Sequence, residues 1–155
     1  MQQLTTHTAG SNSFTFTVLG KPAPQGSKRH VGKGVMVESS QRCNPWRQDV
    51  RFAAFAARPK SWPDLLDKPI LISVVFVFAR PKIHYRTNGD LKPSAPDHCT
   101  GRIGDVDKLS RAILDSCADG VLYTADEQVI SLIAHKRYAN DREQPCAIIT
   151  VTALS

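Results

Sequence analysis

Residues 104–129 read GDVDKLSRAILDSCADGVLYTADEQV, and the rest of the chain can be interpreted around this stretch. Asp105 and Asp107 are separated by one residue, and Asp126 follows later in the same stretch. In extended backbone, residues i and i+2 point to the same side, so the first two carboxylates are expected on one face. Two carboxylates held this close repel each other unless a cation neutralises them. We therefore predict that the three aspartates bind a hard divalent cation such as Mg²⁺ or Mn²⁺ rather than zinc.

Between these acids the sequence predicts a short amphipathic helix over residues 108–118, ended by Gly120. Its apolar positions recur at helical spacing: Leu109, Ala112, Ile113 and Cys117. We expect Asp107 at or near the N-cap, with Arg111 one turn later and Asp115 on the same stripe. Residues 121–123 are then expected to be extended, and the polar turn 124–128 to return Asp126 to the neighbourhood of Asp105.

Two simpler interpretations of these acids stay open. An Asp-x-Asp pair is also common as a solvated pair or a helix cap, and Asp126-Glu127 also fits an ordinary polar turn. The distribution of charge favours the metal site. Residues 105–127 hold six of the 14 acidic residues and only two basic ones, a local charge of about −4, whereas the chain as a whole carries +6.

Length and composition indicate one globular domain over residues 13–155, preceded by a polar, disordered lead at residues 1–12. No apolar run reaches membrane-spanning length and no signal peptide pattern is visible, so we expect a cytoplasmic protein without a membrane partner. The four cysteines lack CxxC spacing, which favours buried thiols over disulfides. The pI of about 9.4 fits a polyanionic partner.

The remaining patterns predict an α+β fold, in which two main helices pack on a mixed β-sheet of about four to six strands. A second helix is expected from Asn44-Pro45 to about Ala57, and Trp62 is expected in the core. Residues 70–78 form the most apolar segment and are predicted to be a central strand. The other expected strands are 13–19, 34–39, 129–138 and 146–153, with residues 140–145 joining the last two as a hairpin loop.

Two basic segments are candidate nucleic-acid contacts. Residues 20–34, GKPAPQGSKRHVGKG, form a Gly- and Pro-containing loop that carries Lys28 and Arg29, although its spacing is not that of a P-loop. About 25 residues without periodicity follow Arg80, and this length indicates a functional or mobile loop. Its cations and Tyr85 suit phosphates and bases. A flexible basic hairpin and a solvated loop are the alternative interpretations of the two segments.

Several short runs together resemble the RusA family of Holliday junction resolvases, especially its actinobacterial and phage versions. The matching runs are DVDKLSR (105–111), LD to DGV (114–121), ADEQV (125–129), LGKP with PQGSKR (19–29) and FARPK (78–82). Their order and spacing are more specific than any one of them, and the resemblance covers roughly Phe14 to Val151.

The resemblance implies a RusA-like, homodimeric, Mg²⁺-dependent endonuclease that cuts four-way DNA junctions symmetrically in recombination and repair. It assigns the family's metal-binding aspartates to Asp105, Asp107 and Asp126, and its essential lysine to Arg111. That replacement matters because arginine does not release a proton and holds phosphate as a planar fork. Lys108 stands where asparagine is usual, and Ala125 replaces the first aspartate of the later pair.

The candidate catalytic residues are therefore the three aspartates and Arg111. The candidate DNA-binding residues are Lys28, Arg29, Arg80, Lys82, Arg86 and Lys108. Two other functions stay open: a non-catalytic DNA-binding module of the same fold, and a metal-dependent nuclease that acts on forks, flaps or RNA.

Overall fold

A computed structural model describes residues 12–26, 28–38, 41–101 and 103–155, with the backbone alone for β2 and β3. The expected disordered lead, residues 1–12, lies almost entirely outside this part. The described elements, in chain order, are β1 (Ser13–Leu19), β2 (Lys28–His30), β3 (Met36–Glu38), α1 (Cys43–Ala57), β4 (Ile70–Phe78), α2 (Val106–Cys117), β5 (Val129–Tyr138) and β6 (Cys146–Ala153). No helix in these ranges is long and apolar enough to cross a membrane.

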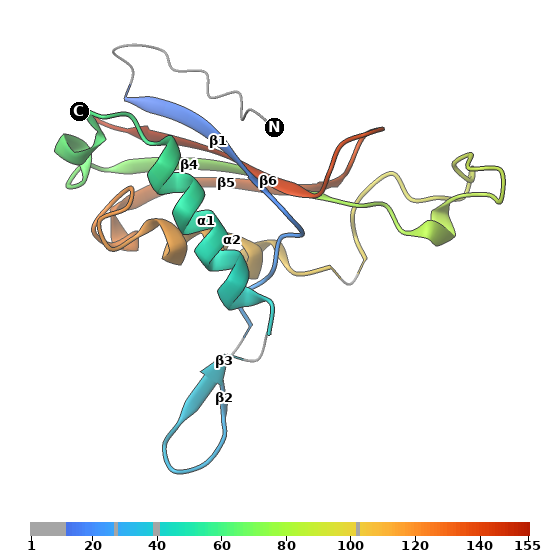
Figure 1. Cartoon of the computed structure of the whole chain (residues 1–155), viewed down its shortest axis with the longest axis horizontal. Coiled ribbons are helices and arrows are strands. Elements are labelled where there is room, and N and C mark those ends of the chain that lie inside the picture. The colour runs from blue at the N-terminus through green and yellow to red at the C-terminus, as the bar shows by residue number, and fades with distance from the viewer. Residues whose placement is uncertain (1–11, 27, 39–40, 102) are drawn as a thin grey trace.

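The predicted α+β class is confirmed: a four-stranded mixed sheet carries two α-helices (Figure 1). The strand order is β1-β6-β4-β5, and β2 and β3 form a separate two-stranded hairpin. Strand β4 runs antiparallel to β6 and parallel to β5. The expected hairpin between β5 and β6 is therefore wrong, because β4 lies between these strands and residues 140–145 cross over its end.

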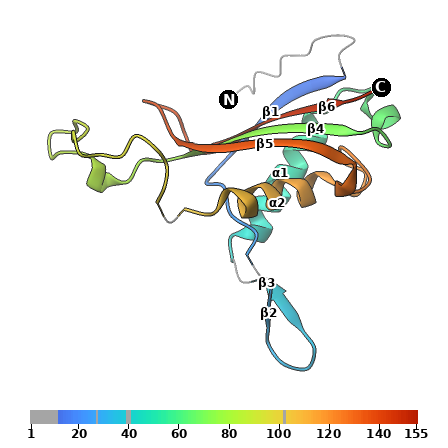
Figure 2. The same cartoon turned by 180° about the vertical axis from the view of Figure 1, so that it is seen from behind.

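Both helices cover the same face of the sheet, as the opposite views show (Figures 1 and 2). In β1 and β6 every second side chain is apolar and points toward the helices, because the side chains of a strand alternate between the two sides of a sheet. Large apolar side chains are buried there: Phe14, Phe16, Val74, Phe76, Ile149, Val50, Leu109 and Ile113. Burying each one contributes about 1.5–3 kcal/mol before entropy is counted. The outward side is mixed: Thr15 and Thr150 share a hydrogen bond of 2.8 Å there, whereas Leu71, Val75 and Ile148 are half-buried apolar residues.

Several local predictions are confirmed and two are corrected. Trp62 is fully buried and donates its Nε1–H to the Leu122 carbonyl at 2.9 Å. All four cysteines are buried, and no disulfide joins them. Helix α1 begins at Cys43, so its N-cap is Arg42 and not the predicted Asn44. The expected strand at residues 121–123 is a buried turn, which Arg58 holds by donating to the carbonyls of Gly120 and Val121.

Two segments project from this body (Figures 1 and 2). The β2–β3 hairpin leaves from the chain that follows β1, and residues 79–101 form a long arm between β4 and α2. Both segments are rooted near the first turn of α2. The Gln25 amide donates to the Lys108 carbonyl at 3.0 Å, and the arm leads directly into Asp105.

Candidate active site

The first two candidate aspartates lie at the N-terminal end of α2. Asp105 occupies the N-cap in extended backbone, and Asp107 lies in the first turn. The prediction placed Asp107 at or near the N-cap, two residues beyond the observed one. No side chain forms a capping hydrogen bond at this end, so the Asp105 carboxylate does not accept one from the backbone N–H groups of the first turn. Both side chains are exposed, and the positive end of the helix dipole favours anionic groups at this position.

The start of α2 is set by backbone and not by side-chain capping. Gly104 has a φ of +117°, and a Cβ there would lie 3.2 Å from Pro24 Cγ and 3.3 Å from Leu109 Cδ2. Only glycine adopts such a backbone without strain. Lys136 of β5 donates its Nζ to the Gly104 carbonyl at 2.9 Å. The end of α2 that carries the two aspartates is therefore tied to both the chain after β1 and the end of β5.

Arg111 shares a face with Asp107, as the helical spacing predicted. Both line a surface hollow of about 300 Å³, together with Ser110 and Leu114 of α2 and Leu132 and Ala134 of β5. Asp105 instead approaches Lys108, with 3.5 Å between Oδ2 and Nζ. Both of these side chains are largely exposed, so this ion pair contributes little to stability. The hollow thus presents one carboxylate and one guanidinium to solvent.

Asp126 lies elsewhere, in a 3-10 helix (Asp126–Gln128) that follows the turn after α2. It lines a hollow of about 260 Å³ with Arg47, Asp115, Asp119 and Thr124. The turn is held by Gln128, whose Oε1 accepts hydrogen bonds from the Thr124 and Ala125 amides and whose Nε2 donates to the carbonyls of Leu66 and Lys68.

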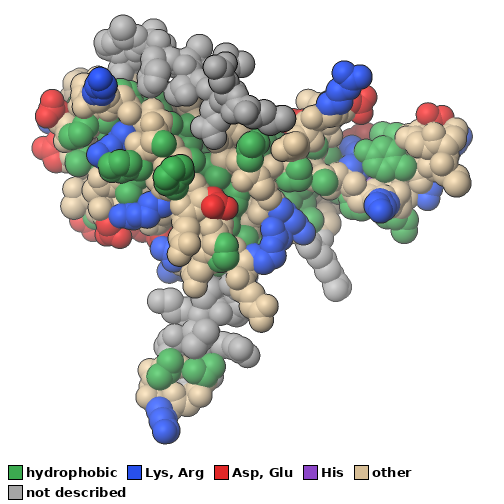
Figure 3. All heavy atoms as spheres, in the orientation of Figure 1, with side chains coloured by type: hydrophobic (Ala, Val, Ile, Leu, Met, Phe, Trp, Pro, Cys, Tyr) green, Lys and Arg blue, Asp and Glu red, His purple; other side chains and the backbone are tan. Residues whose placement is uncertain are grey.

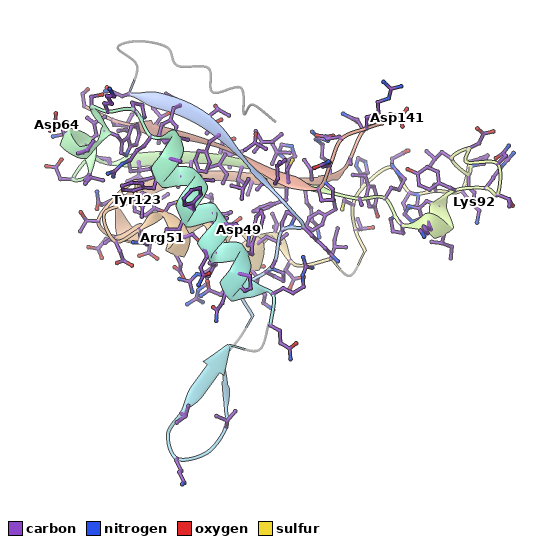
Figure 4. The ribbon with its side chains drawn as sticks, viewed as in Figure 1. Asp49, Arg51, Asp64, Lys92, Tyr123 and Asp141 are labelled. Atoms are coloured by element: carbon purple, nitrogen blue, oxygen red, sulfur yellow. The ribbon has the colours of Figure 1, made fainter. Side chains whose placement is uncertain are left out.

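Tyr123, like Asp126, lies near the C-terminal end of α2. Burial raises the pKa of its hydroxyl, and Cys117, Asp126 and Asp115 raise it further. The hydroxyl donates to the Leu114 carbonyl at 2.7 Å. In Figure 4, Tyr123 and Arg51 lie at the end of the molecule opposite to Lys92 on the arm.

The pair Asp105 and Asp107 therefore lies at one end of α2, and the group of Asp115, Asp119 and Asp126 lies at the other. Asp105 and Asp115 are ten residues apart, which corresponds to about 15 Å along a helix. The structure does not bring Asp126 to Asp105 and Asp107 within one chain, contrary to the expected path of the turn. Across the described ranges, no group of three or more His, Cys, Asp or Glu side chains is placed to hold a metal ion.

The other candidate residues lie on the two projections. Lys28 and Arg29 belong to β2, although their side chains are outside the described part of the chain. Arg80, Lys82 and Arg86 belong to the arm, which reaches away from the sheet (Figure 1). Both projections are rooted near the end of α2 that carries Asp105 and Asp107.

Sequence reasoning missed several charged residues beside the acids. Arg47 lines the Asp126 hollow, and Asp119 belongs to the same group with a φ of +57°. Lys136 supports Gly104. The signal for Arg47 was present, because Arg47 and Arg51 are four residues apart on the polar side of a predicted helix. Nothing in the sequence indicates that Lys136 lies near Asp105, since that contact depends on the parallel pairing of β4 and β5.

One comparison with known proteins matches most of the chain. A family model described as Endodeoxyribonuclease RusA matches residues 20–152, which is most of the chain. No protein among the curated ones matches. The matched region begins just after β1, ends within β6, and includes both helices, the arm and all candidate aspartates. The chain therefore belongs to the RusA family of endodeoxyribonucleases, hydrolases that act on Holliday junctions.

Proposed function

We propose that this chain works as a homodimer that uses Mg²⁺, or Mn²⁺ in its place, to cut four-way DNA junctions symmetrically during recombination and repair. One observation carries the dimeric part of this proposal. The three candidate metal-binding aspartates lie at opposite ends of α2, so one chain alone does not assemble them.

Strand β5 offers the surface through which a second copy would complete the site. It is the edge strand of the described sheet, next to β4 on one side only. An unpaired edge strand exposes backbone N–H and C=O groups that can pair with another strand. Strand β5 also exposes large apolar side chains, including Ile130 at 62% and Ile133 at 63%. Apolar residues on a free edge are typical of a surface that another chain covers.

Antiparallel pairing of two β5 strands across a two-fold axis would complete the carboxylate group. The first residues of β5 follow Asp126, whereas Ala134 lines the hollow of Asp107 and Lys136 contacts Gly104. Antiparallel pairing places the start of one strand opposite the end of its partner. Asp126 of one protomer would then approach Asp105 and Asp107 of the other, twice per dimer, because an isologous interface repeats each contact.

The chemistry of this donor set fits Mg²⁺, which prefers a few carboxylate oxygens together with water and phosphate. Asp105 and Asp107 of one protomer and Asp126 of the other would hold it. A divalent ion bound there supplies charge neutralisation at the phosphate and a more acidic water. Arg111, on the same face as Asp107, would grip the phosphate through its planar fork and stabilise the negative charge that develops on it.

The cations on the two projections would position the DNA. Lys28 and Arg29 on β2, and Arg80, Lys82 and Arg86 on the arm, would contact phosphates on either side of the site, with Lys108 beside it. Two such sites related by a two-fold axis match the symmetry of a four-way junction.

The test is cleavage of a synthetic mobile four-way junction, compared with a Y-fork and a linear duplex, with and without Mg²⁺. We expect paired cuts in the junction that need the ion, and an Asp107→Asn protein that binds the junction but does not cut it. Preferred cleavage of the fork, or of RNA, would favour a different nuclease. Binding without any cleavage in either Mg²⁺ or Mn²⁺ would indicate a non-catalytic module.

A further inference from the structure

The arm (residues 79–101) carries three large apolar side chains that are at least partly exposed. They are Ile83, Tyr85 and Leu91, which we call the arm tip, and Ile83 is 74% exposed. Single exposed apolar residues are ordinary, whereas several on one projection mark an interaction surface. Figure 3 shows hydrophobic side chains on the arm with Lys and Arg side chains beside them.

The arm tip sits on an ordered backbone. Tyr85 and Leu91 form an isolated antiparallel bridge, so their side chains lie on the same side of the arm. The Arg86 amide donates to the Asp90 carbonyl at 2.7 Å, and the Lys92 amide donates to the His84 carbonyl at 2.9 Å. These bonds order the backbone that carries Tyr85 and Leu91 before any ligand binds, which lowers the entropy cost of binding.

The root of the arm is packed on Tyr138 at the end of β5. The Arg80 guanidinium lies 4.3 Å from the centre of the Tyr138 ring, and the His84 ring packs edge-on at 5.5 Å. Arg80 also donates to the Pro96 carbonyl at 2.6 Å, which ties the outgoing and returning halves of the arm together. His84 is thereby anchored, and its neighbour Ile83 is held outward.

The charges around the arm tip point to a polyanion. Residues 80–92 contain four basic residues and one acidic residue, Asp90. The Asp90 carboxylate accepts a hydrogen bond from the Asn88 side chain at 2.9 Å, and the Asp90 amide donates to Asn88. An apolar and aromatic centre bordered by cations suits nucleic acid with accessible base faces, where rings and aliphatic groups contact bases and cations contact phosphates.

Intact duplex does not offer such base faces, because its bases are stacked, whereas the centre of a branched DNA does. We propose that the arm tip is a wedge that packs against bases unstacked at the branch point and so distinguishes a junction from a duplex. This inference rests on the proposed function insofar as it takes branched DNA as the substrate.

The experiment measures base unstacking and binding without cleavage. A four-way junction carries 2-aminopurine at the branch point, and the protein is added without divalent ions. We expect the wild type to raise the fluorescence, and Ile83→Ser and Tyr85→Ala to abolish the rise. Junction affinity should fall roughly five- to hundredfold in Tyr85→Ala, whereas duplex affinity should change less than about twofold because phosphate contacts remain.

Two controls separate stacking from general damage. Tyr85→Phe keeps the ring and should behave as the wild type. Phe52→Ser changes an apolar side chain on α1 that is 77% exposed, and should also leave fluorescence and binding unchanged. Wild-type fluorescence in the arm variants, an equal loss of junction and duplex affinity, or no junction binding by the wild type would overturn the wedge.

The outcome is independent of the nuclease test. Arm-dependent unstacking without Mg²⁺-dependent cleavage would overturn the proposed enzyme and support the wedge. Cleavage with arm-independent fluorescence would do the reverse.

Discussion

Replacing Gln128 by methionine should lower the free energy of unfolding and loosen the turn that carries Asp126. The Gln128 side chain makes four hydrogen bonds of 2.8–3.0 Å, two as acceptor and two as donor. Methionine has a similar length but forms none of these bonds. The turn would thereby lose its connection to Leu66 and Lys68, in the segment before β4.

The size of the effect follows from the surroundings of each bond. Three of the bonds are partly buried and one is exposed, so water replaces the last one at little cost. A buried hydrogen bond contributes about 1 kcal/mol net. We therefore expect the free energy of unfolding to fall by about 2–3 kcal/mol, which lowers Tm by roughly 5–10 °C for a domain of this size.

Urea and thermal unfolding of the Gln128→Met protein measure this loss. The matched control is Glu127→Gln, a change at the exposed neighbouring position, which should stay within about 0.5 kcal/mol of the wild type. Junction cleavage by Gln128→Met should also decrease below its melting temperature. A Gln128→Met protein as stable as the control would refute the role given to these bonds.

Three further predictions concern other parts of the fold. A hydrogen bond from Arg137 lowers the pKa of Glu143, so the stabilisation by this pair is present above the unfolded-state pKa and is lost as the pH falls through the folded-state pKa. In urea titrations, Glu143→Gln should flatten the acid side of the curve of stability against pH, and an unchanged slope would contradict the assignment. Burial raises the pKa of Cys117 to about 12, so at pH 8 Ellman's reagent should leave this thiol unmodified in the native protein and label it after denaturation; rapid native labelling would show that it is accessible. Gly104→Ala should destabilise the protein by about 1–3 kcal/mol in urea unfolding, because of its positive φ and the approach of Pro24, and a neutral result would show that the start of α2 relaxes freely.

Elements with a regular apolar period were predictable from the sequence. The alternation of Phe14, Phe16 and Val18 predicted β1, and the spacing of Leu109, Ile113 and Cys117 predicted α2. These patterns report burial on one face, which the structure confirms. The two main helices followed from the same patterns, whereas β2 (Lys28–His30) lies in the segment 20–34 that was expected to be a loop.

Relations between elements were less predictable. The short polar segment 140–145 fits a hairpin as well as a crossover, so its length alone did not show that β4 separates β5 from β6. Val121 to Tyr123 are apolar because they are buried in a turn beneath Arg58, and a run of three residues does not distinguish this from a strand.

The site shows the same limit. The helical spacing correctly placed Asp107 and Arg111 on one face. The return of Asp126 was inferred from chain connectivity, whereas its position depends on the length of α2 and on the Gln128 contacts to the segment before β4. Sequence spacing alone does not show how far apart α2 holds Asp105 and Asp126.

The most direct test of a site shared between protomers is subunit complementation. Asp107→Asn and Asp126→Asn proteins are each expected to be inactive, and are then mixed, unfolded and refolded together. In a mixed dimer, one site would combine both substitutions and the other would have neither. Random pairing makes about half of the dimers mixed, so strand cutting of a four-way junction with Mg²⁺ should return to about a quarter of the wild-type level per site. A mixture that forms dimers but stays inactive would contradict the shared site.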